Sequence, residues 1–287
     1  GMRKLGCKVL FQPDLKAEDL KDNIGDAQVV VVRSTKVTKE AIQAAPDLSL
    51  IIRAGAGVNT IDLDAASAQG VFVANCPGKN ADAVAELVIG HIIAADRRIV
   101  DAASNLRSGN WKKKEYQNSS GLKGRTFGII GFGTIGQKVI QRVRALEMDI
   151  LVWSRSMTPE KAAAYDVRYA ASPLEVAEQA DVVSFHIAAT PETKHLADKT
   201  FFEKMKNGAV FINTSRGEIV DTAALKTAIR EKGLRVGLDV YENEPGSSTD
   251  DFPDTELASM VNGTPHIGAS TNQASEAIAE ETLRVLK

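Results

Sequence analysis

Short apolar runs without polar alternation recur along the chain, and helix-like stretches lie between them. Eight runs predict strands: Val29–Val32, Leu50–Ile52, Val71–Ala74, Gly128–Ile130, Ile150–Trp153, Val182–Ile187, Val210–Ile212 and Val236–Val240. They are rich in Val and Ile, which suits strands that are covered on both faces of a parallel sheet. Helices are predicted at Asp62–Gln69, Leu174–Gln179 and Thr222–Glu231. This alternation predicts an α/β fold with doubly wound parallel sheets.

A glycine-rich turn, Gly131-Phe132-Gly133-Thr134-Ile135-Gly136, lies between the apolar run Thr126–Ile130 and a helix-like stretch at Ile135–Leu146. This is the strand–turn–helix context of a dinucleotide-binding fingerprint. Gly131 permits the tight turn, Gly133 lets backbone approach a pyrophosphate, and Gly136 lets the helix pack on the strand. The first N–H groups of the helix would point at the phosphates.

The position of this turn predicts how the domains are arranged. Because roughly 125 residues precede it, the cofactor domain is expected to lie inside the chain, with another domain built around it. Residues 1–76 would form the first part of the outer domain, residues 77–267 the dinucleotide-binding domain, and residues 268–287 a helix that returns to the outer domain. The stretch Ala81–Leu106 predicts one long helix that bridges the two, and the polar stretch Arg107–Leu122 predicts a loop.

The position that selects between NAD and NADP carries no carboxylate. An acidic residue normally ends the second strand of such a unit and binds the ribose 2′-OH. Here the strand Asp149–Trp153 is followed by Ser154-Arg155-Ser156. A hydroxyl and a guanidinium suit a 2′-phosphate, so NADP stays open beside NAD. In the alternative interpretation Arg155 is solvated, and NAD is held by its other contacts.

Three polar motifs end or follow later predicted strands: Asn213–Gly217, Asp239–Pro245 and Thr264–Thr271. Because ligands of open α/β sheets bind beyond the carboxyl ends of the strands, Arg216, Glu244 and His266 are expected to converge near a nicotinamide. An arginine can bind a carboxylate and polarise the adjacent keto oxygen. A histidine can exchange the hydroxyl proton, and a neighbouring carboxylate orients the imidazole and favours its protonated form. These residue types fit hydride transfer at a carbonyl.

The other three histidines are given no catalytic role. His91 lies in an apolar helix and is expected to be a core or interface residue with a hydrogen-bond partner. His195 follows a turn at Pro191–Lys194 and is expected at the surface. His186, at a strand end, is expected to border the adenosine.

Composition excludes several classes of function. The 287 residues are 44% apolar and 25% charged, with a net charge of −2, so no basic excess points to nucleic acid. The longest apolar run is far below the roughly 18 residues of a membrane span. Cys7 and Cys76 have no metal-ligand spacing and are too few for a disulfide scaffold. No metal is therefore expected, and a reducing cytoplasm is the expected location.

Taken together, the motifs resemble those of the D-isomer-specific 2-hydroxyacid dehydrogenases, and within that family the branch that oxidises D-3-phosphoglycerate in serine biosynthesis. The similarity extends over nearly the whole chain and includes Val31–Thr38, Arg53–Val58 and Arg107–Tyr116. It implies a Rossmann NAD(P)-binding domain inserted into a flavodoxin-like substrate domain, with NAD as the expected cofactor. It also implies interconversion of a D-2-hydroxy acid and its 2-keto acid, and a homodimer formed through the bridging helix and Arg107–Leu122.

The resemblance assigns roles to individual positions. Arg216 would bind the substrate carboxylate, His266 would be the acid/base, and Glu244 rather than Glu242 would be its partner. The implied cofactor contacts are Gly131, Gly133, Thr134, Ile135, Gly136, Ser154, Arg155, Ile187, Thr214, Ser215, Asp239, Gly268 and Ala269. The implied substrate contacts are Arg33, Arg53, Gly55, Ala56, Gly57, Arg216 and His266, with the two N-terminal arginines at a phosphate group.

The chain departs from the family pattern at both ends. The strand that normally precedes the helix leading into Lys8–Phe11 is missing, so the substrate domain is expected to lack it. The chain stops inside the C-terminal helix, so no serine-sensing domain is expected. Two other functions stay open. The first is a glyoxylate or hydroxypyruvate reductase that uses NADPH, which Arg155 supports. The second is a dinucleotide-sensing interaction protein like the family's corepressors, in which the arginine, glutamate and histidine that match Arg216, Glu244 and His266 are also present.

Overall fold

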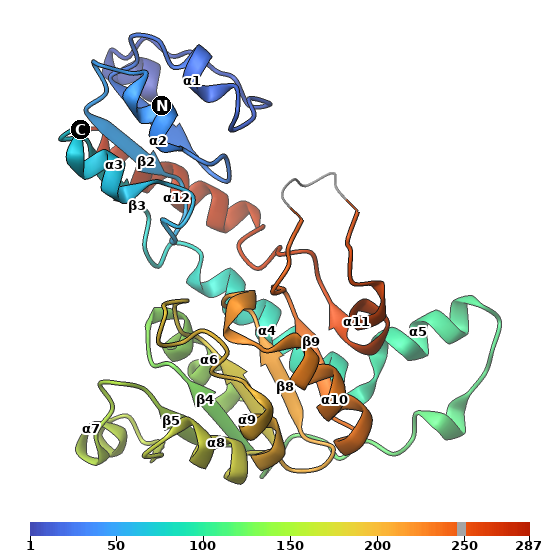
Figure 1. Cartoon of the computed structure of the whole chain (residues 1–287). Coiled ribbons are helices and arrows are strands. Elements are labelled where there is room, and N and C mark those ends of the chain that lie inside the picture. Colours follow the sequence, from blue (N-terminus) through green and yellow to red (C-terminus); the bar gives the residue numbers. More distant parts are fainter. Residues whose placement is uncertain (246–250) are drawn as a thin grey trace. The chain divides into compact units, whose positions relative to one another are not determined.

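The computed structural model describes residues 1–245 and 251–287, which fold into two compact α/β units. Unit 1 comprises Gly1–Ala81 and Ala269–Lys287, and unit 2 comprises Asp82–Gly268. In Figure 1 the two segments of unit 1 are therefore blue to cyan and red. The sequence analysis placed the boundaries after residues 76 and 267, whereas the structure places them after Ala81 and Gly268.

Unit 1 contains a parallel sheet of three strands in the order β1-β2-β3. The strands are β1 (Val29–Val32), β2 (Leu50–Arg53) and β3 (Phe72–Asn75), and the helices are η1 (Met2–Leu5), α1 (Leu20–Asn23), α2 (Lys39–Gln43), α3 (Leu63–Ala68) and α12 (Asn272–Val285). A buried apolar cluster joins α1–α3 to the strands and includes Leu20, Ile42 and Ile51. Among the described residues no strand precedes β1, and Lys8–Phe11 is irregular.

Unit 2 contains a parallel sheet of seven strands in the order β10-β9-β8-β7-β4-β5-β6. The strands are β4 (Thr126–Ile130), β5 (Asp149–Trp153), β6 (Arg168–Tyr169), β7 (Val182–Phe185), β8 (Val210–Asn213), β9 (Arg235–Leu238) and β10 (Asn262–Gly263). In chain order β5 pairs with β4 and β6 pairs with β5, whereas the next strand, β7, pairs with the opposite side of β4. The strand order thus reverses between β4 and β7, the place where ligands of such sheets bind.

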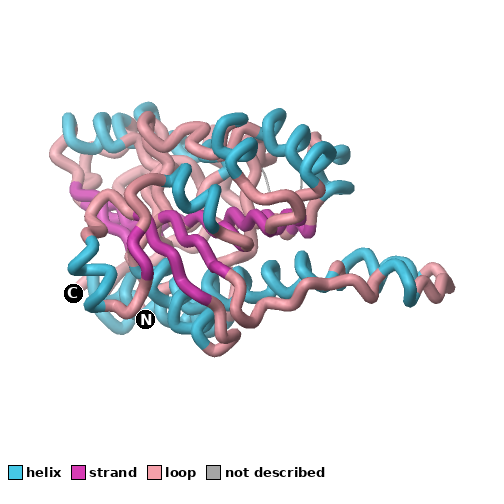
Figure 2. Tube along the Cα trace, turned by 90° about the horizontal axis from the view of Figure 1, so that it is seen from below, coloured by secondary structure: helices cyan, strands magenta, loops and turns pink. Residues whose placement is uncertain are grey.

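Helices cover both faces of this sheet, as the continuous apolar strands predict (Figures 1 and 2). The helices of unit 2, of which α5 and η2 extend away from the sheet (Figure 1), are α4 (Ala81–Arg97), α5 (Ile99–Arg107), η2 (Lys113–Glu115), α6 (Thr134–Arg144), α7 (Pro159–Ala164), α8 (Pro173–Gln179), α9 (Lys199–Lys204), η3 (Gly217–Ile219), α10 (Thr222–Lys232) and α11 (Thr255–Met260). One apolar cluster packs α4, α6 and α7 against one face, and a second packs α8–α11 against the other. Successive residues of one strand enter different clusters: Val210 and Ile212 of β8 join the first, and Phe211 joins the second.

The predicted long helix Ala81–Leu106 is wrong, because the structure has two helices with a break at Arg98. Arg98 adopts a left-handed backbone conformation, with φ at 50°, which an α-helix cannot continue through. Its guanidinium lies over the Tyr116 ring and pairs with Asp101 and Glu115. These contacts compensate for the break, and they involve residues well downstream that helical periodicity does not reveal.

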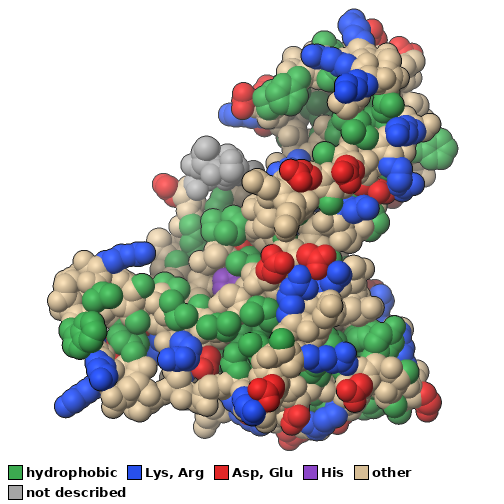
Figure 3. Space-filling model, turned by 180° about the vertical axis from the view of Figure 1, so that it is seen from behind, with side chains coloured by type: hydrophobic (Ala, Val, Ile, Leu, Met, Phe, Trp, Pro, Cys, Tyr) green, Lys and Arg blue, Asp and Glu red, His purple; other side chains and the backbone are tan. Residues whose placement is uncertain are grey.

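The surface carries charges of both signs. Lys, Arg, Asp and Glu side chains are interspersed over the face shown in Figure 3, in keeping with the net charge of −2. In the part of the chain that the structure describes, no helix is long and apolar enough to cross a membrane.

Candidate active site

The glycine-rich turn lies where the strand order of unit 2 reverses, between the end of β4 and the start of α6. Gly131 has φ at 109°, and a Cβ there would lie 2.3 Å from the His186 carbonyl oxygen. A Cβ on Gly136 would lie 2.3 Å from the Gly131 oxygen, so both positions require glycine. A Cβ on Gly133 would meet nothing within 4 Å, which leaves the space above this residue open to a ligand.

The N-terminus of α6 offers hydrogen-bond donors at the same place. Gly133 is its N-cap and provides no side-chain cap. The backbone N–H groups of Thr134, Ile135 and Gly136 belong to the first turn, where a helix supplies no internal partner. A helix N-terminus next to open space suits a pyrophosphate, so the residues present fit the dinucleotide that the sequence predicts.

Two hydroxyls at the carboxyl ends of strands in the same sheet support this fit. Ser154 Oγ, just after β5, and Thr214 Oγ1, just after β8, are buried and have no hydrogen-bond partner among the described residues. Buried polar atoms in native proteins are nearly always paired, so these two hydroxyls are candidates for ligand contacts. Arg155 beside Ser154 is exposed. The predicted cofactor contact Ile187 follows β7, and its Cγ2 would lie 2.8 Å from a Cβ on Gly131.

Arg216 lies in a tight turn after β8 that a buried asparagine organises. Asn213 Oδ1 accepts hydrogen bonds from the N–H and hydroxyl of Ser215, and its Nδ2 donates to the Arg216 carbonyl at 2.8 Å. The next residue, Gly217, packs so tightly that a Cβ would lie 1.9 Å from the Tyr241 oxygen. The Arg216 turn is therefore held against the segment that carries Glu244.

His266 and Glu244 form the pair that the sequence predicts. His266 Nδ1 lies 2.8 Å from Glu244 Oε2, and the side chains are 49% and 33% exposed. The hydrogen bond that His266 Nδ1 donates to Glu244 raises the pKa of His266 above its ordinary value, and partial burial and the Arg216 charge oppose this only in part. Burial raises the pKa of Glu244, but the hydrogen bond and charge of His266 and the charge of Arg216 hold the net pKa below its ordinary value.

The structure thus brings Arg216, Glu244 and His266 together at the carboxyl ends of β8, β9 and β10. These strands are neighbours in the sheet and parallel, so their ends meet along one edge. The catalytic roles of the three residues stay predictions.

Asp239, predicted as a cofactor contact, has an extensive set of contacts within the protein. It is 1% exposed. Its Oδ1 accepts from Thr264 Oγ1 at 2.6 Å and from the Ile267 N–H at 2.8 Å, and its Oδ2 accepts from the Gly268 N–H at 2.8 Å. These bonds fix the loop that carries His266. The sequence signal was present, because Asp239 interrupts the apolar run Val236–Val240.

A second histidine–carboxylate pair was not foreseen. His195 Nε2 lies 2.6 Å from Glu242 Oε1, and Glu242 Oε2 accepts from the Thr222 N–H at the start of α10. Burial raises the pKa of Glu242, but its hydrogen bonds with His195 and Thr222 lower it by more. The net pKa of Glu242 is therefore below its ordinary value. His195 and Glu242 are far apart in the sequence, so no local pattern signals the contact.

His186 and His91 are both involved in hydrogen bonds. His186 Nε2 lies 2.9 Å from Ser184 Oγ, and burial lowers the pKa of His186 to about 3, so this ring is neutral. His91 is 4% exposed and contacts Thr264.

The residues predicted to bind the substrate outside unit 2 lie at the carboxyl edge of the unit 1 sheet. Arg33 directly follows β1, Arg53 ends β2, and Val32 and Arg53 are register partners. The Arg53 guanidinium lies over Gly55, where a Cβ would be 1.6 Å from Nη1. Asn75 Nδ2 donates to the Ala56 carbonyl at 2.6 Å, which fixes the loop that continues to Gly57. Ala269 begins the second segment of unit 1.

In the described parts of the chain, no three His, Cys, Asp or Glu side chains are placed to hold a metal ion together.

Comparison with known proteins relates this geometry to one family. Residues 89–268 match the model for the D-isomer specific 2-hydroxyacid dehydrogenase, NAD binding domain. D-3-phosphoglycerate dehydrogenase of Archaeoglobus fulgidus is 40% identical over 294 residues, which cover 100% of this chain and 54% of that protein. Glyoxylate reductase of Thermococcus litoralis is 38% identical over 262 residues, which cover 89% of this chain and 77% of that protein.

A solved structure shows the same fold. D-lactate dehydrogenase from Aquifex aeolicus, complexed with NAD and lactic acid, matches with a TM-score of 0.82 and 28% identity, over 93% of this chain and 84% of that one. The present chain spans about half the length of the curated phosphoglycerate dehydrogenases that it matches. The family model covers more than half of the chain, and so the chain belongs to the D-isomer specific 2-hydroxyacid dehydrogenase family.

Proposed function

We propose that this chain interconverts a D-2-hydroxy acid and its 2-keto acid with a nicotinamide cofactor. The observation that carries the proposal is the 2.8 Å pair between His266 Nδ1 and Glu244, with the Arg216 charge close enough to affect the pKa of both. This constellation follows three neighbouring strand ends in the same sheet as the glycine-rich turn. The bound cofactor would supply the hydride acceptor.

The roles of the three residues follow from which atoms are free. Because Glu244 holds Nδ1 of His266, Nε2 is the atom that can take the hydroxyl proton during oxidation and return it during reduction. Glu244 fixes the orientation of the ring and favours its charged form. The guanidinium of Arg216 would pair with the substrate carboxylate in a fork geometry. Backbone groups of Gly133–Gly136 and the hydroxyls of Ser154 and Thr214 would hold the cofactor.

The experiment that tests these roles compares His266→Ala with Arg216→Ala. We expect His266→Ala to lower kcat by about 10²–10⁴-fold and to leave the NADH Kd, measured by fluorescence, nearly unchanged. Arg216→Ala should lower kcat and raise the substrate KM together. Wild-type turnover in His266→Ala would exclude this residue as the acid/base.

For the substrate we propose D-3-phosphoglycerate. Arg33 follows β1 and Arg53 ends the adjacent β2, and a phosphorylated substrate needs cations beyond the one that binds its carboxylate. The loop Gly55–Gly57 is proposed to contribute backbone groups to the carboxylate. The relative from Archaeoglobus fulgidus supports this assignment at 40% identity.

Reduction of glyoxylate or hydroxypyruvate is the second candidate, because a glyoxylate reductase and a hydroxypyruvate reductase are each 38% identical to the chain. Initial rates with phosphohydroxypyruvate, hydroxypyruvate and glyoxylate, each with NADH and NADPH, separate the two. A kcat/KM that is higher for phosphohydroxypyruvate, and that Arg33→Ala and Arg53→Ala lower selectively, is expected. Equal rates with and without the phosphate would favour the second candidate.

NAD is the proposed cofactor, with NADP accepted because no carboxylate follows β5 to repel a 2′-phosphate. Ser154 and exposed Arg155 occupy that place. The fingerprint turn itself does not discriminate between the two, since it contacts only the pyrophosphate.

A homodimer is proposed on the basis of exposed apolar side chains on α5 and after it. Leu106 is 59% exposed and Trp111 is 80% exposed, and Ile99 and Val100 on the same helix are also exposed. Apolar side chains gathered in this way are typical of association surfaces. We expect Leu106→Glu to give a monomer by light scattering, whereas the control Leu174→Glu on α8 should not. An unchanged mass for Leu106→Glu would exclude this surface.

A further inference from the structure

We propose that His91, Thr264 and Asp239 form a hydrogen-bonded column that positions His266, which makes Thr264 and His91 positioning residues of the reaction. The inference rests on the acid/base role proposed above for His266. The column begins on α4, passes through the residue after β10, and ends at the carboxylate after β9. All of its members lie in unit 2.

His266 needs an external support because its own backbone is strained. It has φ at 51°, a left-handed conformation that is costly for a residue other than glycine. Its N–H donates to the Thr264 carbonyl at 3.0 Å. The residue between them, Pro265, has no N–H to contribute, so the turn has few hydrogen bonds of its own.

Asp239 provides that support through hydrogen bonds to the loop backbone. Its two oxygens accept the backbone N–H groups of Ile267 and Gly268, the two residues after His266. A Cβ on Gly268 would lie 2.8 Å from Asp239 Oδ2, so the backbone of the loop lies closer to the carboxylate than a residue with a side chain would allow. The position of the imidazole therefore depends on where this carboxylate is held.

The donors and acceptors in the column fix its direction. A carboxylate only accepts, so the 2.6 Å contact between Thr264 Oγ1 and Asp239 Oδ1 uses the single proton of the threonine hydroxyl. Thr264 Oγ1 must then accept at its 3.2 Å contact with His91 Nε2. Burial lowers the pKa of His91, so its ring is neutral and carries its proton on Nε2. The column runs from His91 through Thr264 to Asp239.

Both ends of the column are fixed by packing. A Cβ on Gly237 of β9 would lie 2.8 Å from His91 Cβ. Because Gly237 has no side chain, α4 can approach β9 closely at this point, and the His91 ring reaches Thr264. The Thr264 backbone is held on both sides, because its N–H donates to the Leu238 carbonyl at 2.9 Å and its carbonyl accepts from Tyr241 Oη at 3.2 Å. The hydroxyl is therefore presented to Asp239 in one orientation.

The charged groups that face His266 within unit 2 are Glu244, Asp239 and Arg216. Glu244 has the largest effect through its hydrogen bond, Asp239 adds to it, and Arg216 opposes it. A displaced loop would weaken the Glu244 bond first. The pH profile of the reaction therefore reports on loop position, which a residue that served only stability would leave unchanged.

The test compares Thr264→Val, which removes the hydroxyl at nearly constant shape, with Thr264→Ser, which retains it. We expect Thr264→Val to lower kcat by roughly 10–100-fold, the loss that a misplacement of about 1 Å produces. The pKa in its kcat/KM profile should move down towards that of an ordinary histidine, with the NADH Kd within about twofold of wild type. Thr264→Ser should restore both values. The control is Thr227→Val on α10, whose hydroxyl donates to the Ala223 carbonyl of its own helix.

A second pair of variants decides the matter if Thr264→Val does not fold. His91→Gln keeps an N–H near the position of Nε2, whereas His91→Leu does not, so only His91→Leu should lose turnover and shift the pH profile. Wild-type kinetics in Thr264→Val or His91→Leu would overturn the column, as would a loss that Thr264→Ser fails to recover. If His266→Ala itself retains turnover, the proposed acid/base role fails instead, and the two failures are told apart.

Discussion

At the scale of single residues, two glutamates in one short segment serve different histidines. Glu244 binds His266 Nδ1, and Glu242 binds His195 Nε2. The family resemblance implied Glu244 rather than Glu242 as the partner of His266, and the observed pairing agrees with it. The role of Glu242 could not be read from the sequence, since its partner lies on a loop before α9.

The two pairs allow a matched test of pH dependence. Glu244→Gln removes the charge that raises the pKa of His266, so that pKa should fall towards its ordinary value. In the proposed mechanism protonated His266 donates in reduction, so reduction should be active below this pKa and be lost as pH rises through it; oxidation should behave in the opposite way. We therefore expect the alkaline limb of the reduction profile to move to lower pH in Glu244→Gln, and to stay in place in Glu242→Gln. A shift of equal size in both variants would contradict the assignment.

Arg155 carries the prediction on cofactor choice. An exposed guanidinium beside Ser154 can form an ion pair with a 2′-phosphate but not with a neutral ribose hydroxyl. Arg155→Glu should therefore lower kcat/KM for NADPH by about tenfold or more relative to NADH, since one charge-assisted bond of roughly 1.5–3 kcal/mol is lost. Steady-state kinetics with both cofactors measure the ratio. The control Lys199→Glu changes the same charge on α9, and an unchanged ratio in Arg155→Glu would show that Arg155 is merely solvated.

At the scale of elements, the apolar runs predicted strands well where both faces are covered. All eight predicted runs contain a strand. In the unit 2 sheet, burial on both faces leaves little place for polar residues, whereas β1 and β3 of unit 1 are partly exposed and were found by their run of Val and other apolar residues. The two missed strands, β6 at Arg168–Tyr169 and β10 at Asn262–Gly263, are two residues long and carry no apolar run. The break between α4 and α5 was missed for a different reason, since contacts of Arg98 with Glu115 and Tyr116 are tertiary.

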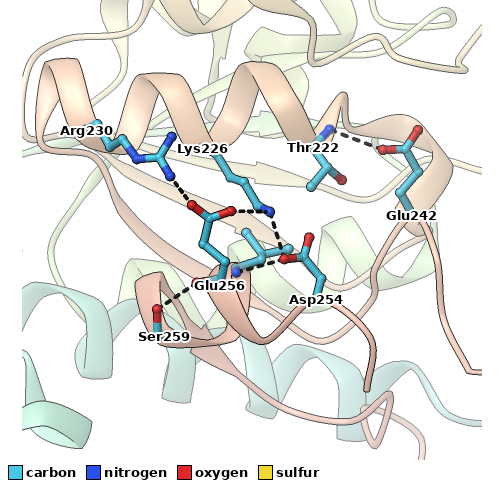
Figure 4. A network of polar contacts seen from close by, with 8 residues as sticks. Thr222, Lys226, Arg230, Glu242, Asp254, Glu256 and Ser259 are labelled. Atoms are coloured by element: carbon cyan, nitrogen blue, oxygen red, sulfur yellow. Dashed lines mark hydrogen bonds and ion pairs between the residues drawn. The ribbon is translucent and has the colours of Figure 1, made fainter. Parts of the chain in front are cut away.

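A charged network joins α10 to α11 ahead of β10 (Figure 4). Lys226 Nζ lies 2.7 Å from Asp254 Oδ1 and 2.9 Å from Glu256 Oε2, and Arg230 also pairs with Glu256. The Lys226 side chain is 18% exposed, and networks of this kind stabilise more than isolated surface pairs. Asp254 also caps α11 by accepting from the Leu257 N–H.

Lys226→Met should lower Tm by about 2–4 °C, the shift that corresponds to roughly 1 kcal/mol in a unit of this size. The physical reason is that Asp254 and Glu256 would lose the cation between them and repel each other. Differential scanning calorimetry measures the change. Lys204→Met is the control, because its ion pair with Glu178 joins two side chains that are half-exposed or more. Equal Tm values for the two variants would show that the network adds nothing.

At the scale of the whole molecule, the order of strands explains why much of the site was predictable. Arg216, Glu244 and His266 come after consecutive strands of one parallel sheet, so their convergence follows from topology alone. The supporting contacts were not predictable in this way. His91 reaches Thr264 from a helix 173 positions earlier in the chain, and only the packing of α4 on Gly237 brings the two together.

The two units differ in how the chain builds them, and we expect their stabilities to differ as well. Unit 2 is one continuous segment with its own sheet and two apolar clusters, whereas unit 1 is assembled from both ends of the chain. The groups proposed to hold the cofactor lie within unit 2 from Gly131 to Gly268, and only the last of the predicted contacts, Ala269, belongs to unit 1. A ligand stabilises only the unit that binds it, by about 2.7 kcal/mol at 100 times its Kd.

We therefore expect two thermal transitions, of which NADH at 100 times its Kd raises only one, by about 5–10 °C. The matched variant is Gly131→Ala, whose Cβ would lie 2.3 Å from the His186 carbonyl oxygen and would distort the turn. That variant should keep both transitions and lose the NADH shift, because the distortion affects the pyrophosphate-binding turn and not the sheet of unit 1. Calorimetry with and without NADH measures both. A single transition that NADH shifts as a whole would mean that the two units unfold together, and the assignment of stability to separate units would then be wrong.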